Sequence, residues 1–189
     1  MFAAAGLEVI DLDGAGIPES TAEANLEEFD SFEENALAKA KYFRAKSGLV
    51  TIADDSGLEV QALGGAPGVH TKRWSGRADL EGRALDVANN DFLLRKLGKS
   101  ADRRARYVCV AAIIDGSGPR TFRSETEGEI LDAPRGEGGF GYDPLFLSSE
   151  LGITFAEAER AVKERGSHRG RAFVQLIGWL AARARGQRT

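Results

Sequence analysis

Residues 49–60 have the sequence LVTIADDSGLEV, in which a short apolar run ends at two carboxylates, a hydroxyl and a glycine. The apolar run, bounded by Gly48 and a polar turn, predicts a buried strand because it suits strand length better than helix length. In open α/β sheets ligands bind beyond the carboxyl ends of strands, so we expect Asp54, Asp55 and Ser56 to meet a ligand. Adjacent carboxylates repel, which favours a hard divalent cation such as Mg²⁺ between them. A solvated Asx turn explains the same residues equally well.

The composition is that of an ordinary globular chain. It has 189 residues, 42% of them hydrophobic, and a formal net charge of -4. A chain of this size can bury one sizeable core, so we expect a single domain over residues 1–189. No segment has membrane-spanning length or the features of a signal peptide, which predicts a cytoplasmic protein without membrane contact. The acidic balance argues against binding nucleic acid, whereas local Lys and Arg can still bind a small phosphate ligand.

Hydrophobic periodicity predicts three helices. The clearest covers residues 32–46, where Ser31 and Glu34 match a capping box. The other two cover residues 80–97 and 169–182. In the capping box, the Glu34 side chain accepts a hydrogen bond from the amide of the cap residue. This structural role competes with any role of Glu34 as a metal ligand.

Alternating or continuous apolar residues predict several strands. They cover residues 7–12, 58–62 and 106–114, and residues 121–130 return beside the last of these as an antiparallel hairpin. Residues 14–25 are polar and contain Gly and Pro, which predicts a loop. The single Cys109 lies within the apolar run of the first hairpin strand, where a buried structural thiol is expected rather than a nucleophile.

A second informative stretch covers residues 134–146, PRGEGGFGYDPLF, with four glycines around Phe140. Glycines let the backbone approach a ligand closely, and they hold the ring of Phe140 at a loop surface. An exposed ring of this kind is suited to stacking on a base. Asp143 then either hydrogen-bonds a base edge or fixes the loop, and a purely structural turn is the alternative to both.

The last helix begins with polar residues that can bind an anion or a carbonyl. Ser167 is expected to cap this helix, and His168 and Arg169 then point donors out of its electropositive end. Such donors suit a carbonyl or phosphate oxygen. A surface cap with no ligand is the simpler explanation of the pair when it is considered alone.

Taken together, these stretches resemble the inosine/xanthosine triphosphate pyrophosphatase family, also described as ITPase-like enzymes for noncanonical purine nucleotides. The resemblance extends over nearly the whole chain, and the motifs have the order and spacing of the family. Its motifs are FEENA at 32–36 with Lys39 and Ala40, ADDSGL at 53–58, LGGAPGV at 63–69, GGFGYDP at 138–144, and Lys163 followed by SHRG at 167–170.

The resemblance implies a fold and an activity. The family fold is an elongated α/β domain with a long mixed sheet flanked by helices, typically assembled as a homodimer. The implied activity is a Mg²⁺-dependent hydrolysis of ITP, dITP or XTP to the monophosphate and pyrophosphate, which clears deaminated purines from the nucleotide pool.

The resemblance also implies site residues. Asp55 corresponds to the family's general base or metal ligand, and Glu34 to a second acid at the metal. Ser56 falls at a substrate-contacting position. The remaining substrate positions form the base pocket and the groups that reach the purine and its 6-oxo oxygen: Phe140, Gly141, Tyr142, Asp143, Lys163, His168 and Arg169.

One family feature has no counterpart in this chain. The family usually opens with a strand and a phosphate-binding loop of the pattern Thr/Ser-x-Asn-x-x-Lys-x-x-Glu, which leads into the first helix. Residues 6–10 of this chain align with the segment that comes after that helix. An upstream start and a truncation both explain the difference, and we expect weaker triphosphate binding without the loop. The alternative functions are therefore a non-catalytic nucleotide-binding or dimer-forming remnant, and a pyrophosphatase for other modified nucleotides.

Overall fold

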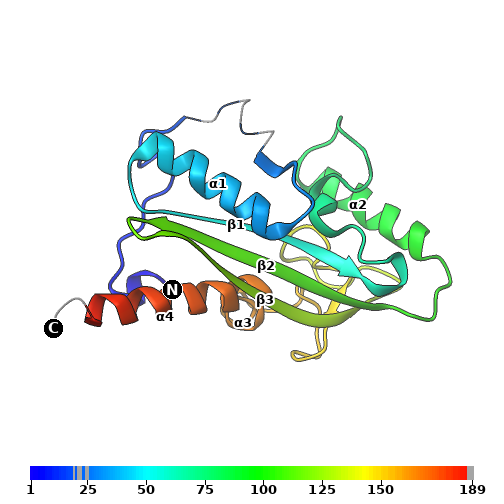
Figure 1. The fold of residues 1–189 in the computed structure, drawn as a ribbon. Helices are drawn as coiled ribbons and strands as arrows, with labels where there is room; N and C mark the ends of the chain where they lie inside the picture. The colour runs from blue at the N-terminus through cyan, green and yellow to red at the C-terminus, as the bar shows by residue number, and fades with distance from the viewer. Residues whose placement is uncertain (19, 21–22, 24–25, 187–189) are drawn as a thin grey trace. The chain divides into compact units, whose positions relative to one another are not determined.

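The computed structural model describes residues 1–18, 20, 23 and 26–186 (Figure 1). The chain forms two compact units, each assembled from separate segments. The first unit contains Met1–Asp55, Cys109–Ser124 and Arg171–Thr189, and the second contains Ser56–Val108 and Glu125–Gly170. The boundary therefore falls between the neighbouring residues Asp55 and Ser56. The expected single domain over residues 1–189 stays a prediction.

The described strands form one sheet in the order β1-β2-β3-β4. Their bounds are Thr51–Val60, Arg104–Asp115, Gly118–Ile130 and Phe146–Ser148. Strand β4 pairs antiparallel with β3, with Gly128 opposite Ser148, and the arrows of β1, β2 and β3 alternate in direction (Figure 1). The α/β class with a sheet flanked by helices is confirmed. The described strands are antiparallel rather than mixed in direction.

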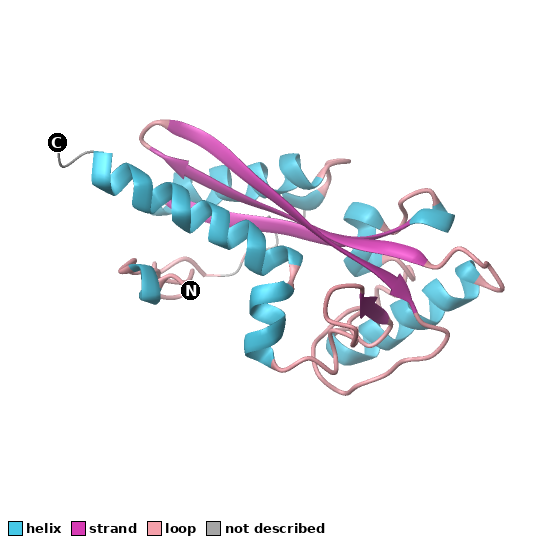
Figure 2. Ribbon diagram, turned by 90° about the horizontal axis from the view of Figure 1, so that it is seen from below, coloured by secondary structure: helices cyan, strands magenta, loops and turns pink. Residues whose placement is uncertain are grey.

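In the first unit, helices α1 (Phe32–Ser47) and α4 (His168–Gly186) lie on opposite faces of the strands (Figure 1). Figure 2 looks onto the face that α4 crosses. There Ala172 and Leu176 of α4 pack against Cys109 and its neighbours on alternate positions of β2. Cys109 is fully buried and forms no disulfide, as its apolar context predicts. The first unit also contains the 3₁₀ helix η1 (Ala3–Ala5).

The second unit contains α2 (Gly82–Leu97), α3 (Arg160–Gly166) and two 3₁₀ helices, η3 (Gln61–Leu63) and η4 (Gly68–Arg73). In its core the rings of Tyr107, Phe146 and Phe155, which come from different segments, contact one another. The fully or nearly fully buried members of this core are Leu58, Val60, Leu93, Leu97, Ala105, Tyr107, Ile130, Tyr142, Leu145, Phe146 and Phe155.

The helices and the hairpin agree with the sequence predictions. Helix α1 begins after Ser31, whose side chain accepts a hydrogen bond from the Glu34 amide, and it ends at Gly48 in the left-handed conformation. Helix α2 ends before Gly98, and β2 and β3 are neighbours in the sheet. The short helix α3 was not predicted. Among the described residues, no helix has the length and apolar character needed to cross a membrane.

Three local predictions differ from the structure. Residues 7–12 form no strand, because Asp11 closes a turn by accepting the Gly14 amide at 2.8 Å, and no neighbouring strand pairs with the segment. The expected strand over residues 58–62 is the end of β1, and Ala62 lies in η3. The loop expected for residues 14–25 is irregular where described, and positions 19, 21–22 and 24–25 lie outside the described residues.

Candidate active site

The Asp-Asp-Ser-Gly sequence is not a turn, because its backbone continues as the middle of strand β1. Successive side chains of a strand point to opposite faces, so the two carboxylates diverge. Asp54 lies 3.6 Å from the thiol of Cys109, and Asp55 contacts Asn35 and Lys39 of α1. Mutual repulsion of these carboxylates, which was expected to favour a divalent cation between them, is therefore not an argument for a metal here. The expectation that the residues lie beyond the carboxyl end of a strand is also wrong.

Asp55 is nevertheless the centre of a charged cluster in the first unit. Its Oδ1 accepts a hydrogen bond from Lys39 Nζ at 2.8 Å, and its Oδ2 accepts one from Asn35 Nδ2 at 3.1 Å. Lys39 Nζ also lies 2.8 Å from Glu27 Oε1. Asn35 and Lys39 are four residues apart and so share one face of α1. The carboxylates of Asp55 and Glu27 thus converge on the ammonium group of Lys39.

Burial and charge act in opposite directions on this cluster. Burial raises the pKa of the Asp55 carboxyl, although the hydrogen bonds from Lys39 and Asn35 oppose that shift. Burial also favours the neutral amine of Lys39, but its contacts with Asp55 and Glu27 outweigh this and raise its pKa. A buried acid whose proton affinity is raised in this way is a candidate general base.

Glu34 lies apart from these contacts, at the exposed start of α1. Its Oε2 accepts a hydrogen bond from Ser31 Oγ at 2.7 Å, and its own amide donates to Ser31 Oγ at 3.2 Å. The capping role expected for Glu34 is therefore present, with the Ser31 hydroxyl as donor in place of the amide. The structure does not bring Glu34 into contact with Asp55, and its role as a metal ligand stays a prediction.

The carboxylate oxygens of Asp55 and Glu27 are of the ligand type that a hard cation prefers. Within the described residues, no three His, Cys, Asp or Glu side chains are grouped so as to hold a metal ion. The carboxylates of Asp55 and Glu27 do approach one cationic position, which Lys39 Nζ fills. Mg²⁺ is often held by only one or two carboxylates together with substrate phosphates, so the pair has suitable ligands, but a metal held by both would displace Lys39 from this position.

A second cluster, in the second unit, surrounds the ring of Phe140, which is 62% exposed. The glycine-rich loop expected to display this ring is held by side chains at both of its central residues. The Phe140 amide donates to Asp143 Oδ2 at 2.7 Å. Asp86 accepts from the Gly141 amide at 2.8 Å, and Asn90 donates to the Gly141 carbonyl at 3.0 Å. The loop thus displays its ring on a fixed backbone.

Cations lie beside the same ring. Lys163 Nζ is 4.8 Å from the centre of the Phe140 ring, and the Arg169 guanidinium carbon is 5.8 Å from it. Lys163 also forms an ion pair with Asp143, which is only 2% exposed. Burial raises the pKa of the Asp143 carboxyl, while Lys163 and the Phe140 amide favour its charged form. Asp143 therefore fixes the loop and Lys163 together.

His168 is the first residue of α4 and is 7% exposed. Its ring is parallel to that of Tyr107, with 4.6 Å between ring centres, and Phe155 lies nearly parallel beyond. Burial, reinforced by the charges of Arg169 and Lys163, lowers the pKa of His168 to about 3. The imidazole is neutral at physiological pH, and its Nδ1 is buried without a hydrogen-bond partner in the described part of the chain.

The remaining predicted substrate residues have different environments. Ser56 accepts a hydrogen bond from Arg169 at 2.9 Å, and Ser167 Oγ accepts the amide of Gly170 at 3.1 Å, as expected of a helix cap. Tyr142 is buried in the core and donates its hydroxyl hydrogen to the Thr71 carbonyl at 3.0 Å. The contacts described above bring Ser56, Phe140, Asp143, Lys163 and Arg169 together. His168 joins them through Phe155, whose ring centre lies 5.5 Å from Lys163 Nζ, and Tyr142 lies in the core of the same unit.

Sequence reasoning missed several residues that hold these clusters. In the first unit they are Glu27, Asn35 and Lys39, of which the last two belong to a recognised motif but were given no role. In the second unit they are Asp86, Asn90, Tyr107 and Phe155. The four-residue spacing of Asn35 and Lys39, and of Asp86 and Asn90, is the one local signal that could have identified pairs on a shared helix face.

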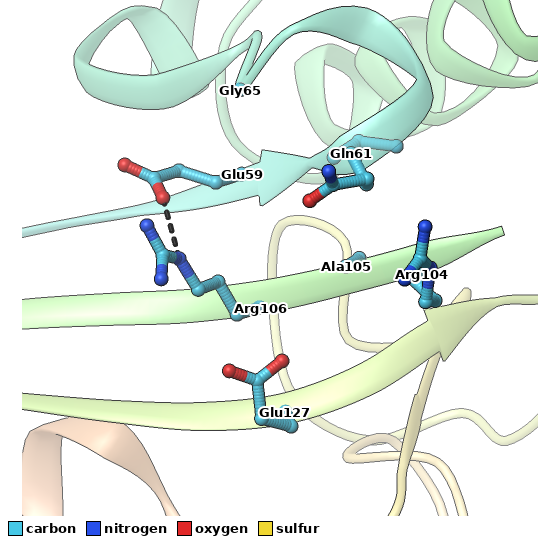
Figure 3. A pocket seen from close by; sticks show the side chains of 8 residues that line it. Glu59, Gln61, Gly65, Arg104, Ala105, Arg106 and Glu127 are labelled. Atoms are coloured by element: carbon cyan, nitrogen blue, oxygen red, sulfur yellow. Dashed lines mark hydrogen bonds and ion pairs between the residues drawn. The ribbon is translucent and has the colours of Figure 1, made fainter. Parts of the chain in front are cut away.

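A pocket of about 370 Å³ lies elsewhere in the second unit, over the ends of β1, β2 and β3 (Figure 3). Its two cations are already paired, since Arg106 contacts Glu59 at 2.7 Å and Glu125 at 3.0 Å. Arg104 is held by Asp102 at 2.8 Å. The lining offers neither an exposed ring for a base nor an uncompensated cation for a phosphate, so the Phe140 cluster is the better candidate.

Comparison with known proteins identifies the family. A model of the Ham1 family matches residues 1–179. The chain belongs to the Ham1 family. This confirms the family assignment made from the sequence motifs.

Individual Ham1 proteins agree with this assignment. The chain is 47% identical over 186 residues to a dITP/XTP pyrophosphatase of Syntrophobacter fumaroxidans, covering 94% of this chain and 76% of the relative. A HAM1 protein from Coxiella burnetii has a similar structure, with a TM-score of 0.81, 34% identity, and coverage of 93% of this chain and 87% of that one. The Staphylococcus aureus Ham1 protein gives a TM-score of 0.76 at 39% identity, covering 83% and 80%.

Proposed function

We propose that this Ham1 protein hydrolyses deaminated purine nucleoside triphosphates, namely ITP, dITP and XTP, to the monophosphate and pyrophosphate. The relative from Syntrophobacter fumaroxidans carries the name of this activity at 47% identity. The structural observation that carries the proposal is the exposed ring of Phe140 with Lys163 and Arg169 beside it. A flat ring flanked by donors is a receptor for a heterocycle that bears carbonyl oxygens.

Base recognition is assigned to the Phe140 cluster. The base stacks on the ring of Phe140, while Lys163 and Arg169 supply donors that have no acceptor capacity. The neutral His168 adds one ring N–H. Hypoxanthine and xanthine present a 6-oxo acceptor to such donors, whereas adenine presents an amino group, and two facing donors repel. Discrimination arises from this mismatch.

The hydrolytic step is assigned to Asp55. Water attacks the α-phosphorus, the bond from that phosphorus to the bridging oxygen breaks, and pyrophosphate leaves with the bond's electron pair. Asp55 accepts the proton of the attacking water, for which its raised pKa suits it. Lys39, 2.8 Å from Asp55, holds the carboxylate in place. Mg²⁺, when bound, would offset the negative charge of the triphosphate.

The metal ligands are part of the proposal. Asp55 is the first ligand, and Glu34 is the second acid that the family resemblance implies. Glu27 is a competing choice, because its carboxylate approaches the same ammonium group as that of Asp55. The proposal further includes a homodimer in the cytoplasm, where the nucleotide pool is found, with no nucleic-acid partner. The net charge of -4 agrees with the last point.

The test is pyrophosphate release from ITP, XTP, GTP and ATP with and without Mg²⁺. We expect metal-dependent turnover of ITP and XTP, reduced at least about 100-fold in Asp55→Asn, since such a base typically contributes that much or more. Asp54→Asn is the matched control, because Asp54 points to the other face of β1, and it should lose far less. Nucleotide binding without turnover would instead indicate a non-catalytic protein, and faster turnover of dUTP a different pyrophosphatase.

A further inference from the structure

Helix α2 holds the loop that displays Phe140 through two side chains one helical turn apart. Asp86 and Asn90 are separated by four residues, so they project from the same face of the helix. Asp86 Oδ2 accepts the Gly141 amide at 2.8 Å, and Asn90 Nδ2 donates to the Gly141 carbonyl at 3.0 Å. The amide and the carbonyl of Gly141 are thus both hydrogen-bonded by side chains of α2. We call Asp86 and Asn90 the α2 clamp.

Asp143 restricts the loop on the other side of Phe140. Gly139 has a φ of 72°, and a Cβ at this position would collide with the carboxylate of Asp143. The Phe140 amide is held by that same carboxylate at 2.7 Å. The backbone on both sides of the ring is therefore fixed, on one side by Asp143 and on the other by the α2 clamp. The ring itself is contacted by Lys163 and Arg169.

Asn90 is a poor choice for stability alone. The residue is 6% exposed, and its Oδ1 is buried without a hydrogen-bond partner among the described residues. Leaving a buried acceptor unpaired is unfavourable, and an apolar side chain of similar size would avoid it. Among the described residues, the Asn90 amide group makes one hydrogen bond, from Nδ2 to the Gly141 carbonyl. This points to a requirement for the loop rather than for the core.

We infer that Asp86 and Asn90 are positioning residues for base recognition, which hold Phe140 as a preformed stacking platform for the deaminated purine. This inference rests on the proposed function. A ring whose backbone is already fixed loses less conformational entropy when a base stacks on it, so binding is tighter. The two residues touch the loop backbone and act through the ring of Phe140, without direct contact with the reacting atoms.

A double-mutant cycle tests the inference, with the KM and kcat for ITP and the dissociation constant for IMP as readouts. Phe140→Ala should weaken IMP binding about 5-fold to 150-fold, the range expected for one stacked base. Asn90→Ala and Asp86→Ala should each weaken it about 5-fold by loss of one hydrogen bond, with KM changing more than kcat. In the Phe140→Ala background the same substitutions should have less than about a 2-fold effect, because coupled residues are not additive.

Asn89→Ala is the matched control on the same helix. Asn89 accepts the Ser75 amide at 2.8 Å and donates to the Lys72 carbonyl at 3.0 Å, so it holds a different loop by equivalent bonds. The fold-change in IMP binding caused by Asn89→Ala should be the same in the wild type and in the Phe140→Ala background. Asp86→Asn keeps an acceptor for the Gly141 amide and should recover most of the affinity lost in Asp86→Ala.

Hydrogen exchange gives a readout of the clamp without nucleotide. The Gly141 amide should exchange faster in Asp86→Ala than in the wild type, because its acceptor is gone. Unchanged exchange, or effects of Asp86→Ala and Asn90→Ala that add fully to that of Phe140→Ala, would overturn the inference and leave the proposed function standing. A wild type that neither turns over ITP nor binds IMP would overturn both.

Discussion

Replacing His168 by Phe should remove a large part of the acid sensitivity of this protein. His168 is buried against the parallel ring of Tyr107, and its pKa falls to about 3 from the ordinary 6.5. The charges that face it are the cations Lys163 and Arg169, which oppose a second positive charge. Phe keeps a flat ring in this position and cannot titrate.

The magnitude depends on the two pKa values. The unfolded chain binds a proton at this histidine below pH 6.5, whereas the folded chain excludes it until about pH 3. The free energy of unfolding therefore falls as the pH falls through 6.5, and the loss levels off below the folded pKa. Full protonation of His168 lowers the free energy of unfolding by about 5 kcal/mol. Between pH 7.5 and pH 5 the free energy of unfolding falls by about 2 kcal/mol through this group.

The assay is urea unfolding followed by tryptophan fluorescence, at pH 7.5 and pH 5, for the wild type and His168→Phe. Subtracting the free energy of unfolding of one protein from that of the other cancels the contributions of the other titrating groups. On going from pH 7.5 to pH 5, this difference should shift by about 2 kcal/mol in favour of His168→Phe. His70→Asn is the control, because His70 is the other histidine of the chain and is exposed. A difference that is the same at both pH values would refute the burial of a neutral imidazole.

Three further pairs of substitutions test the Asp55 cluster, the loop at Phe140 and the cap of α4. Glu27→Gln should reduce Mg²⁺-dependent ITP turnover more than Glu34→Gln, as measured by pyrophosphate release, and the opposite order would restore Glu34 as the second acid. Gly139→Ala should lower the melting temperature more than Gly141→Ala, because both have positive φ but a Cβ collides with a carboxylate only at Gly139. Ser167→Ala should lose about 1 kcal/mol of stability in urea unfolding through loss of a helix cap, and Ser167→Asn should retain most of it.

The elements with a strong periodic pattern were predictable. Helix α1 combines apolar residues at helical spacing with a capping serine, Ser31, and the left-handed Gly48, so that sequence and tertiary contacts favour the same conformation. The β2–β3 hairpin likewise arises from a buried apolar run. The short α3 carries no comparable apolar stripe, which explains why no pattern in the sequence predicted it.

Strand β1 shows why a local pattern can mislead. Asp54, Ser56 and Gly57 are ordinary turn formers, yet all lie in an extended strand. Strand β1 tolerates them because each polar side chain has a partner on its own face. Asp54 lies near the thiol of Cys109, and Ser56 accepts a hydrogen bond from Arg169. Gly57 is buried without a side chain. Partners that are distant in sequence override turn propensity here, and they are invisible to local reasoning.

The candidate site was predictable only in part. Residues within recognised motifs, such as Asp55, Phe140 and His168, could be named from the sequence with a role implied by the family. The α2 clamp could not, because Asp86 lies 55 residues and Asn90 lies 51 residues from Gly141. A helix-face spacing identifies which side chains share a direction, but the backbone that they meet is set by the tertiary fold.

The charge balance around Phe140 accounts for the preference that we propose for one class of purine. Asp143 is the one carboxylate that contacts this loop at Phe140, and its Oδ2 already accepts from the Phe140 amide and from Lys163. Beside the ring, Lys163 and Arg169 carry donors only, whereas the neutral His168 carries one N–H and one acceptor nitrogen. An exocyclic amino group beside the ring faces these two donor-only cations, whereas a carbonyl oxygen can accept from both. Deamination replaces the first by the second, so under the proposed function the arrangement selects the chemical change that distinguishes a damaged purine from adenine.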